Sequence, residues 1–170
     1  INVIPIIDSK MFSVKDLNLW LKRTNEISIT QAFSTDISLM NKKSIYTPFY
    51  FVENHNSKEF LELIKKLNID CMLNAGTPRK ISQNILNHVE KGIVNVHPGI
   101  LPKYRGCSCI EWAIYNDEQI GNTVHLMSSD YDAGPVIKIE TYNFSQYLNY
   151  KDIRTHVLLR SVELAAEALE

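Results

Sequence analysis

The chain has 170 residues, a formal net charge of −1 and an apolar fraction of 45%, values typical of an ordinary globular domain with a sizeable core. A net charge so close to zero gives no general reason to expect binding to nucleic acid or to a membrane surface. No apolar run reaches the length of a membrane span, and no signal peptide is visible, although the first residue is Ile1 rather than methionine. We therefore expect a single domain over residues 1–170, with any segment ahead of Ile1 left open.

The cysteines indicate a reducing, cytoplasmic compartment. Cys71, Cys107 and Cys109 are odd in number and form no C-x-x-C pair, which argues against a disulfide framework and a structural zinc site. Cys107 and Cys109 lie where a helix should start, a position that can lower the pKa of a thiol. We nevertheless favour small residues packing that helix start over a catalytic cysteine.

Strand-like and helix-like segments alternate through most of the chain. Apolar and β-branched runs predict strands at residues 2–7, 27–33, 47–52, 70–74, 92–97, 122–128 and 135–141. Helical spacing predicts helices at residues 14–24, 57–67, 81–89 and 108–115, and one from about residue 150. Ser57 is a good N-cap, and Asn149 is one with Asp152 three residues on. This order predicts an α/β domain: a Rossmann-like, open, mostly parallel sheet with helices on both faces.

The most informative segment is Asn95-Val-His-Pro-Gly-Ile-Leu-Pro-Lys-Tyr-Arg-Gly106. Residues two apart in a strand face the same side, so Asn95 and His97 should point together before Pro98 ends the strand. A second strand-like run is followed by Asp132. Ligands of such sheets bind outside the carboxyl ends of strands, so an amide, an imidazole and a carboxylate there predict a site for acyl chemistry.

Several polar residues allow a plainer interpretation. A lone Asn-x-His is more often a hydrogen-bonded polar pair, and only the following loop and Asp132 favour a site. His125 lies mid-strand and either supports the site or is simply a buried, hydrogen-bonded histidine. Asp130 is more simply a turn-capping residue than half of a carboxylate pair. His55 and the other histidines outside these segments are expected in loops or on helix surfaces.

The segment from Asn95 to Gly106, together with Thr123-Val-His-Leu and Asp132-Ala-Gly134, closely resembles the folate-dependent formyltransferases. That family includes phosphoribosylglycinamide, methionyl-tRNA and sugar N-formyltransferases. The resemblance implies the formyltransferase fold, 10-formyltetrahydrofolate as formyl donor, and no metal. It assigns catalytic roles to Asn95, His97 and Asp132, and implies a cis peptide before Pro102. It also implies two folate-binding segments: a loop with Gly76, Thr77, Pro78, Arg79 and Ile81, and a pterin-holding backbone with Met127, Ser128, Ser129, Asp130 and Tyr131. For Arg79, capping the next helix is the alternative.

The chemistry of formyl transfer can be matched to the three polar residues. The reaction passes through a tetrahedral carbon that bears an oxyanion, so the enzyme must stabilise negative charge and manage protons. The Asn95 amide and a protonated His97 can donate to the oxyanion. Asp132 can favour and orient that imidazolium, and it can relay the amine proton through water. The scheme needs neither a metal nor a covalent intermediate.

The acceptor is indicated mainly by departures from the family pattern. Residues 8–13 lack the Gly- and Ser-rich phosphate loop of the glycinamide ribonucleotide enzymes. From this sequence we expect no barrel-like second domain, and the charge balance disfavours tRNA. We expect a small phosphorylated or nucleotide-linked amine, an amino sugar ahead of glycinamide ribonucleotide, with no nucleic-acid or membrane partner and with a homo-oligomer left open. Two alternatives remain: a hydrolase of 10-formyltetrahydrofolate, and a non-catalytic folate-binding or interaction domain.

Overall fold

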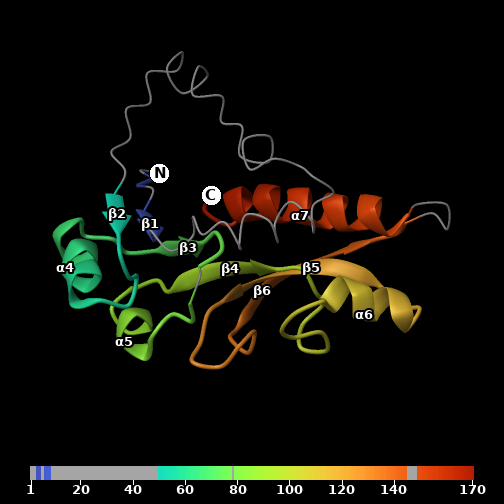
Figure 1. Cartoon of the computed structure of the whole chain (residues 1–170), viewed down its shortest axis with the longest axis horizontal. Helices are drawn as coiled ribbons and strands as arrows, with labels where there is room; N and C mark the ends of the chain where they lie inside the picture. The colour runs from blue at the N-terminus through green and yellow to red at the C-terminus, as the bar shows by residue number, and fades with distance from the viewer. Residues whose placement is uncertain (1–2, 5, 9–49, 78, 145–148) are drawn as a thin grey trace, which may run out of the picture.

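The computed structural model describes residues 3–4, 6–8, 50–77, 79–144 and 149–170. The helix expected at 14–24, the strand expected at 27–33 and, apart from Asp8, the segment 8–13 lie outside the described residues. Strands and helices alternate along the described part of the chain (Figure 1). In order they are β1 Ile6–Asp8, β2 Tyr50–Val52, α4 Lys58–Lys66, β3 Met72–Asn74, α5 Gln83–Leu86, β4 Ile93–His97, α6 Cys109–Tyr115, β5 Ile120–Leu126, β6 Val136–Tyr142 and α7 Tyr150–Glu167.

The described strands form two hydrogen-bonded groups. β1 and β2 pair in parallel, and β3, β4, β5 and β6 form a four-stranded sheet in that spatial order. β3 and β4 are parallel and place Asn74 beside Asn95, whereas β5 is antiparallel to both β4 and β6. The α/β class is confirmed, but this sheet is mixed, with β5 as its reversed strand, rather than mostly parallel.

The reversal of β5 changes where its carboxyl end lies. His97 at the end of β4 pairs with Thr123 in the middle of β5, and Leu126 at the end of β5 pairs with Val94, further back along β4. The expectation that Asp132 follows a strand ending at the same edge as β4 was therefore wrong. Because antiparallel neighbours end at opposite edges, the chain after Leu126 must fold back before Asp132 can approach His97.

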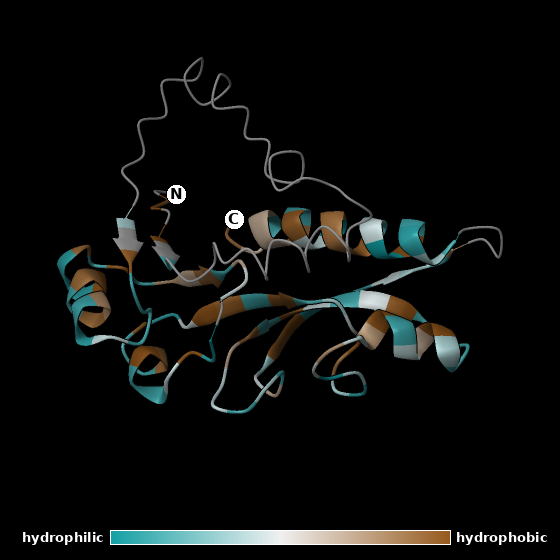
Figure 2. Ribbon diagram, viewed as in Figure 1, coloured by the Kyte–Doolittle hydropathy of each residue, from teal (hydrophilic) through white to brown (hydrophobic). Residues whose placement is uncertain are grey.

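Helices cover both sides of the four-stranded sheet. α7 lies along one side and α6 lies on the other (Figure 1). Leu164 of α7 packs on Val94 and Val124, and all three side chains are buried. Apolar residues lie along β4 and within α7 (Figure 2). Val94 and Val124 alternate with Asn95 and His125, so α7 leaves the side that carries Asn95 free for the site.

The predicted helix caps are confirmed. The Ser57 side chain accepts a hydrogen bond from the Phe60 N–H, and the Asn149 side chain accepts one from the Asp152 N–H. Such caps satisfy backbone donors that the first helical turn leaves without partners. Within the described residues, no helix combines the length and the apolar character needed to cross a lipid bilayer.

Candidate active site

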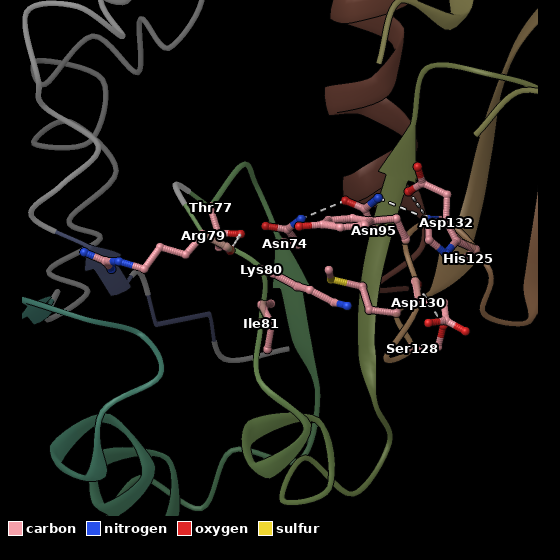
Figure 3. A pocket seen from close by; sticks show the side chains of 12 residues that line it. Asn74, Thr77, Arg79, Lys80, Ile81, Asn95, His125, Ser128, Asp130 and Asp132 are labelled. Atoms are coloured by element: carbon pink, nitrogen blue, oxygen red, sulfur yellow. Dashed lines mark hydrogen bonds and ion pairs between the residues drawn. The ribbon is translucent and has the colours of Figure 1, made fainter. Parts of the chain in front are cut away.

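A cavity of about 360 Å³ opens beside β3, β4 and β5, a volume within the usual range for small-molecule sites. Two loops form its walls, one after β3 and one after β5 (Figure 3). Seven residues predicted to bind folate line it: Thr77, Arg79, Ile81, Met127, Ser128, Asp130 and Tyr131. Gly76 and Ser129 are absent from this lining, and Pro78 lies outside the described residues. Asn74, Lys80, Asn95, His125 and Asp132 complete it.

The Asn95 amide is held from both sides. Its Oδ1 accepts a hydrogen bond from Asn74 Nδ2 at 2.9 Å, and its Nδ2 lies 3.1 Å from Nε2 of His125 (Figure 3). His125 Nδ1 lies 2.9 Å from the Leu126 carbonyl, which can only accept. His125 therefore carries its proton on Nδ1 and accepts from Asn95 on Nε2. One hydrogen of the Asn95 amide is used in this way, which leaves the other for a ligand.

His97 and Asp132 lie next to this amide. His97 Nε2 is 2.8 Å from the Tyr104 carbonyl, so Nε2 carries a hydrogen, and Nδ1 lies 3.5 Å from Asp132 Oδ2. Asp132 Oδ1 is 3.7 Å from His125 Nε2. The structure thus brings Asn95, His97 and Asp132 together. Asp132 lines the cavity, whereas His97 lies behind it and is not part of the lining.

Asp132 reaches His97 through a tight return of the chain. The Leu126 N–H donates to the Pro135 carbonyl, and Asp132 has a left-handed backbone with φ 49°. A Cβ at Gly134 would lie 1.9 Å from the Leu126 carbonyl oxygen, so only glycine fits where the two segments meet. Asp132 Oδ2 also accepts the Gly106 N–H at 2.8 Å. This bond ties the loop after β5 to the loop after β4.

Burial sets the protonation state of His97. The ring is only 4% exposed, and burial lowers the pKa of His97, although the nearby Asp132 carboxylate acts in the opposite direction. This finding differs from the expectation of a protonated His97 directed at the oxyanion. A neutral ring whose Nδ1 faces a carboxylate is instead ready to share a proton with it.

Cys109 is a packing residue beside His97. Its sulfur lies 3.3 Å from His97 Nε2 and donates to the Gly106 carbonyl. Burial raises the pKa of the Cys109 thiol to about 11, so the thiolate that a nucleophile requires is scarce at neutral pH. The helix start therefore does not activate this cysteine. Among the described residues, no group of three or more His, Cys, Asp or Glu side chains is arranged to hold a metal ion.

Gly99 lies where the His97 ring, Cys109 and the Tyr104 carbonyl meet. A Cβ there would lie 2.8 Å from both Cys109 Cβ and His97 Nε2. We expect Gly99→Ala to cost about 1–3 kcal/mol of stability, as overpacking does, and to reduce turnover by displacing the ring. Thermal unfolding and a turnover assay measure the two effects. Lys103→Ala, an exposed change in the same loop, is the control. An unchanged melting temperature in Gly99→Ala would contradict the tight fit.

Arg79 lines the cavity, but its guanidinium points away from Asn95 (Figure 3). It contacts the buried Asp8 carboxylate and donates to the Glu53 carbonyl at 3.3 Å. His55 also binds Asp8, with its Nδ1 2.9 Å from Oδ2, and is 5% exposed. His55 lies in a loop, one of the two positions expected for it, but its side chain is buried. The cavity loop is therefore tied to β1 by a buried carboxylate.

Sequence reasoning did not assign Asn74 or Lys80 to the site. Asn74 ends β3 directly before the predicted folate loop and pairs in register with Asn95, so its position was the available signal. The sequence left His125 with two interpretations, a residue that supports the site or simply a buried, hydrogen-bonded histidine. Its contact with Asn95 favours the first. The Leu101–Pro102 peptide is cis, as the resemblance implied.

Comparison with known proteins identifies the class of this fold and site. Residues 22–160 match the sequence model of the formyl transferase family. The match covers most of the chain, so the chain belongs to that family.

Individual relatives differ in the acceptor that their names state. A methionyl-tRNA formyltransferase from Borrelia hermsii is 35% identical over 114 residues, which cover 66% of this chain and 37% of the relative. A phosphoribosylglycinamide formyltransferase structure from Bacillus halodurans superposes with a TM-score of 0.61 at 25% identity, covering 75% of this chain and 71% of that one. A sugar N-formyltransferase structure from Shewanella sp. superposes with a TM-score of 0.56 at 18% identity, covering 95% of this chain and 67% of that one. The last likeness shows the fold alone.

Proposed function

We propose that this chain transfers a formyl group from 10-formyltetrahydrofolate to the amine of a small acceptor. The observation that carries the proposal is the fixed Asn95 amide beside the Asp132 carboxylate, both lining one cavity. Formyl transfer needs a donor for the developing oxyanion and an acceptor for the amine proton. Asn95 and Asp132 are suited to these two tasks.

The protein residues divide this work by position. Asn95 directs its remaining amide hydrogen at the formyl oxygen as negative charge develops, and Asn74 and His125 prevent the amide from rotating. Asp132, whose side chain is 14% exposed, takes the amine proton directly or through water. His97 stabilises the proton on Asp132, because His97 Nδ1 lies 3.5 Å from Asp132 Oδ2. In this scheme His97 is a positioning residue, not an oxyanion donor.

The lining of the cavity supports a folate as the donor. Ile81 is 4% exposed and lines it together with Met127, which gives an apolar surface for a flat ring, and Ser128 and Asp130 add polar groups. The rest of the lining is largely polar, which suits a ligand that combines a flat ring with several hydrogen-bonding groups. When bound, the folate supplies the activated formyl group.

A small phosphorylated or nucleotide-linked amine, with an amino sugar first, is the acceptor we propose. Two of the basic residues beside the site are engaged in ion pairs, Arg79 with Asp8 and Lys103 with Glu118, which weakens the case for a polyanion such as tRNA. Methionyl-tRNA is the second candidate, because the curated relative from Borrelia hermsii carries that name. The chain spans only 37% of that relative's length, so the relative's name does not decide the acceptor. An assay with each candidate acceptor does.

The test is a formyl-release assay with 10-formyltetrahydrofolate. The protein is incubated with the donor alone and then with a nucleotide-linked amino sugar, glycinamide ribonucleotide or methionyl-tRNA, and both loss of the donor and the formylated product are measured. We expect release that depends on the amino sugar. Release without any amine would favour the hydrolase, and binding without release would favour the non-catalytic domain. Formylation of methionyl-tRNA alone would replace the proposed acceptor.

A further inference from the structure

The two neighbouring cations of the cavity loop are used differently. Arg79 turns toward Asp8, whereas Lys80 extends toward β4 and the loop that carries Asp130 (Figure 3). Within the described part of the chain, the Lys80 ammonium makes no ion pair. Lys80 thus presents a positive charge to the cavity that is not neutralised by a contacting carboxylate.

The position of Lys80 is fixed by its backbone. Asn56 donates to the Lys80 carbonyl at 2.8 Å and accepts the Ser82 N–H at 2.7 Å. These two bonds clamp the loop on either side of Ile81. A lysine held in this way loses less conformational freedom on binding an anion than a lysine on a loose loop does.

Lys80 meets Tyr131 across the cavity. Its ammonium lies 4.9 Å from the centre of the Tyr131 ring, within the range of a cation–π contact. The two residues belong to the loops that form opposite walls, after β3 and after β5. Tyr131 is 67% exposed, which is unusual for a large aromatic side chain that serves only packing. Its ring is therefore available to a ligand.

We propose that Lys80 and Tyr131 form a two-sided clamp that binds the p-aminobenzoylglutamate part of the donor. The proposal rests on the proposed function. Tyr131 stacks against the aromatic ring, and Lys80 pairs with the first glutamyl carboxylate. In that part of a folate, only an amide group and one carbon separate the ring from the carboxylate. A cation and a ring in contact across the cavity match this combination, and the clamp makes the site selective for folates that carry an anionic tail.

The main test measures binding of 5-formyltetrahydrofolate, an isomer of the donor, by isothermal titration calorimetry, and the KM of the amine from a turnover assay is a second readout. We expect Lys80→Gln to bind about tenfold more weakly, as for one lost charge-assisted hydrogen bond, and Lys80→Arg to recover most of the loss. Raising the salt concentration should narrow the gap between the wild type and Lys80→Gln. Tyr131→Leu should bind about fivefold more weakly, and Tyr131→Phe should restore the affinity.

A modified ligand and a matched variant make the test specific. The bis-carboxamide of 5-formyltetrahydrofolate, which lacks both carboxylate charges, should bind equally to the wild type and to Lys80→Gln. Lys66→Gln, an exposed lysine at the end of α4, should retain wild-type affinity. Equal binding of 5-formyltetrahydrofolate by the wild type and Lys80→Gln would overturn the clamp alone. An effect of Lys80→Gln confined to the KM of the amine would also overturn it, by assigning the anion to the acceptor. Failure of the wild type to bind the folate would overturn both the clamp and the proposed function.

Discussion

Asn95→Ala is expected to lower kcat by about 10²- to 10³-fold, the usual effect of removing one oxyanion donor. The Asn95 amide is fixed between Asn74 and His125 before any ligand binds, so its contribution requires no rearrangement during the reaction. Substrate affinity should change much less, because the formyl oxygen is only weakly negative before attack. Steady-state kinetics with separate kcat and KM values measure both quantities.

Two further variants separate catalysis from stability in this experiment. Asn95→Asp keeps the volume but replaces the N–H donor with an acceptor, so it should lose activity at least as severely as the alanine variant. Asn143→Ala removes an exposed amide beyond β6 and should retain both activity and melting temperature. A folded Asn95→Ala variant with near-wild-type kcat would eliminate the oxyanion role of this residue.

Local signals were enough to predict two helix caps and two of the three proposed catalytic residues. Ser57 and Asn149 were identifiable as caps because a cap depends on residues within one helical turn. Asn95 and His97 could be placed together because the strand repeat is two residues. Both inferences need only neighbours in sequence, and the resemblance supplied Asp132.

Strand direction could not be predicted in the same way. Alternating strands and helices favour parallel pairing, and nothing in the sequence around Val124 and His125 indicates whether β5 runs with or against β4. The reversal is visible only in the register that pairs His97 with Thr123. It explains why the return to Asp132 needs Gly134, where a Cβ would collide with the Leu126 carbonyl.

Contacts between distant segments were also beyond the sequence. Asp8 and His55 are 47 positions apart, and each alone suggests only a turn or a surface residue. Arg79 also binds Asp8. Its guanidinium, which was expected to contact the folate, is therefore directed toward β1 instead. Lys80 was overlooked for a related reason, because its partner Tyr131 belongs to a loop on the other wall of the cavity.

Asp132→Asn is expected to lower kcat by about 10²- to 10⁴-fold, the range typical of general acid–base groups. The change removes the carboxylate that receives the amine proton but keeps the shape of the side chain and its bond from the Gly106 N–H. It also leaves His97 without its anionic neighbour, while the burial that lowers the pKa of His97 remains. The pKa of His97 should therefore fall further in the variant.

The pH profile tests this assignment, because its expected direction is fixed. Activity requires His97 to be free to share the incoming proton, so activity declines as the pH falls through the pKa of His97. Asp132 raises that pKa, so the acidic limb of the residual activity in Asp132→Asn should move to lower pH than in the wild type.

Asp117→Asn is a matched control, because Asp117 is exposed and shares the left-handed backbone, with φ 53° against 49°. Asparagine tolerates that conformation as aspartate does, so both variants should fold. An acidic limb that stays in place, or moves to higher pH, would separate Asp132 from His97 and leave the carboxylate with a purely structural role.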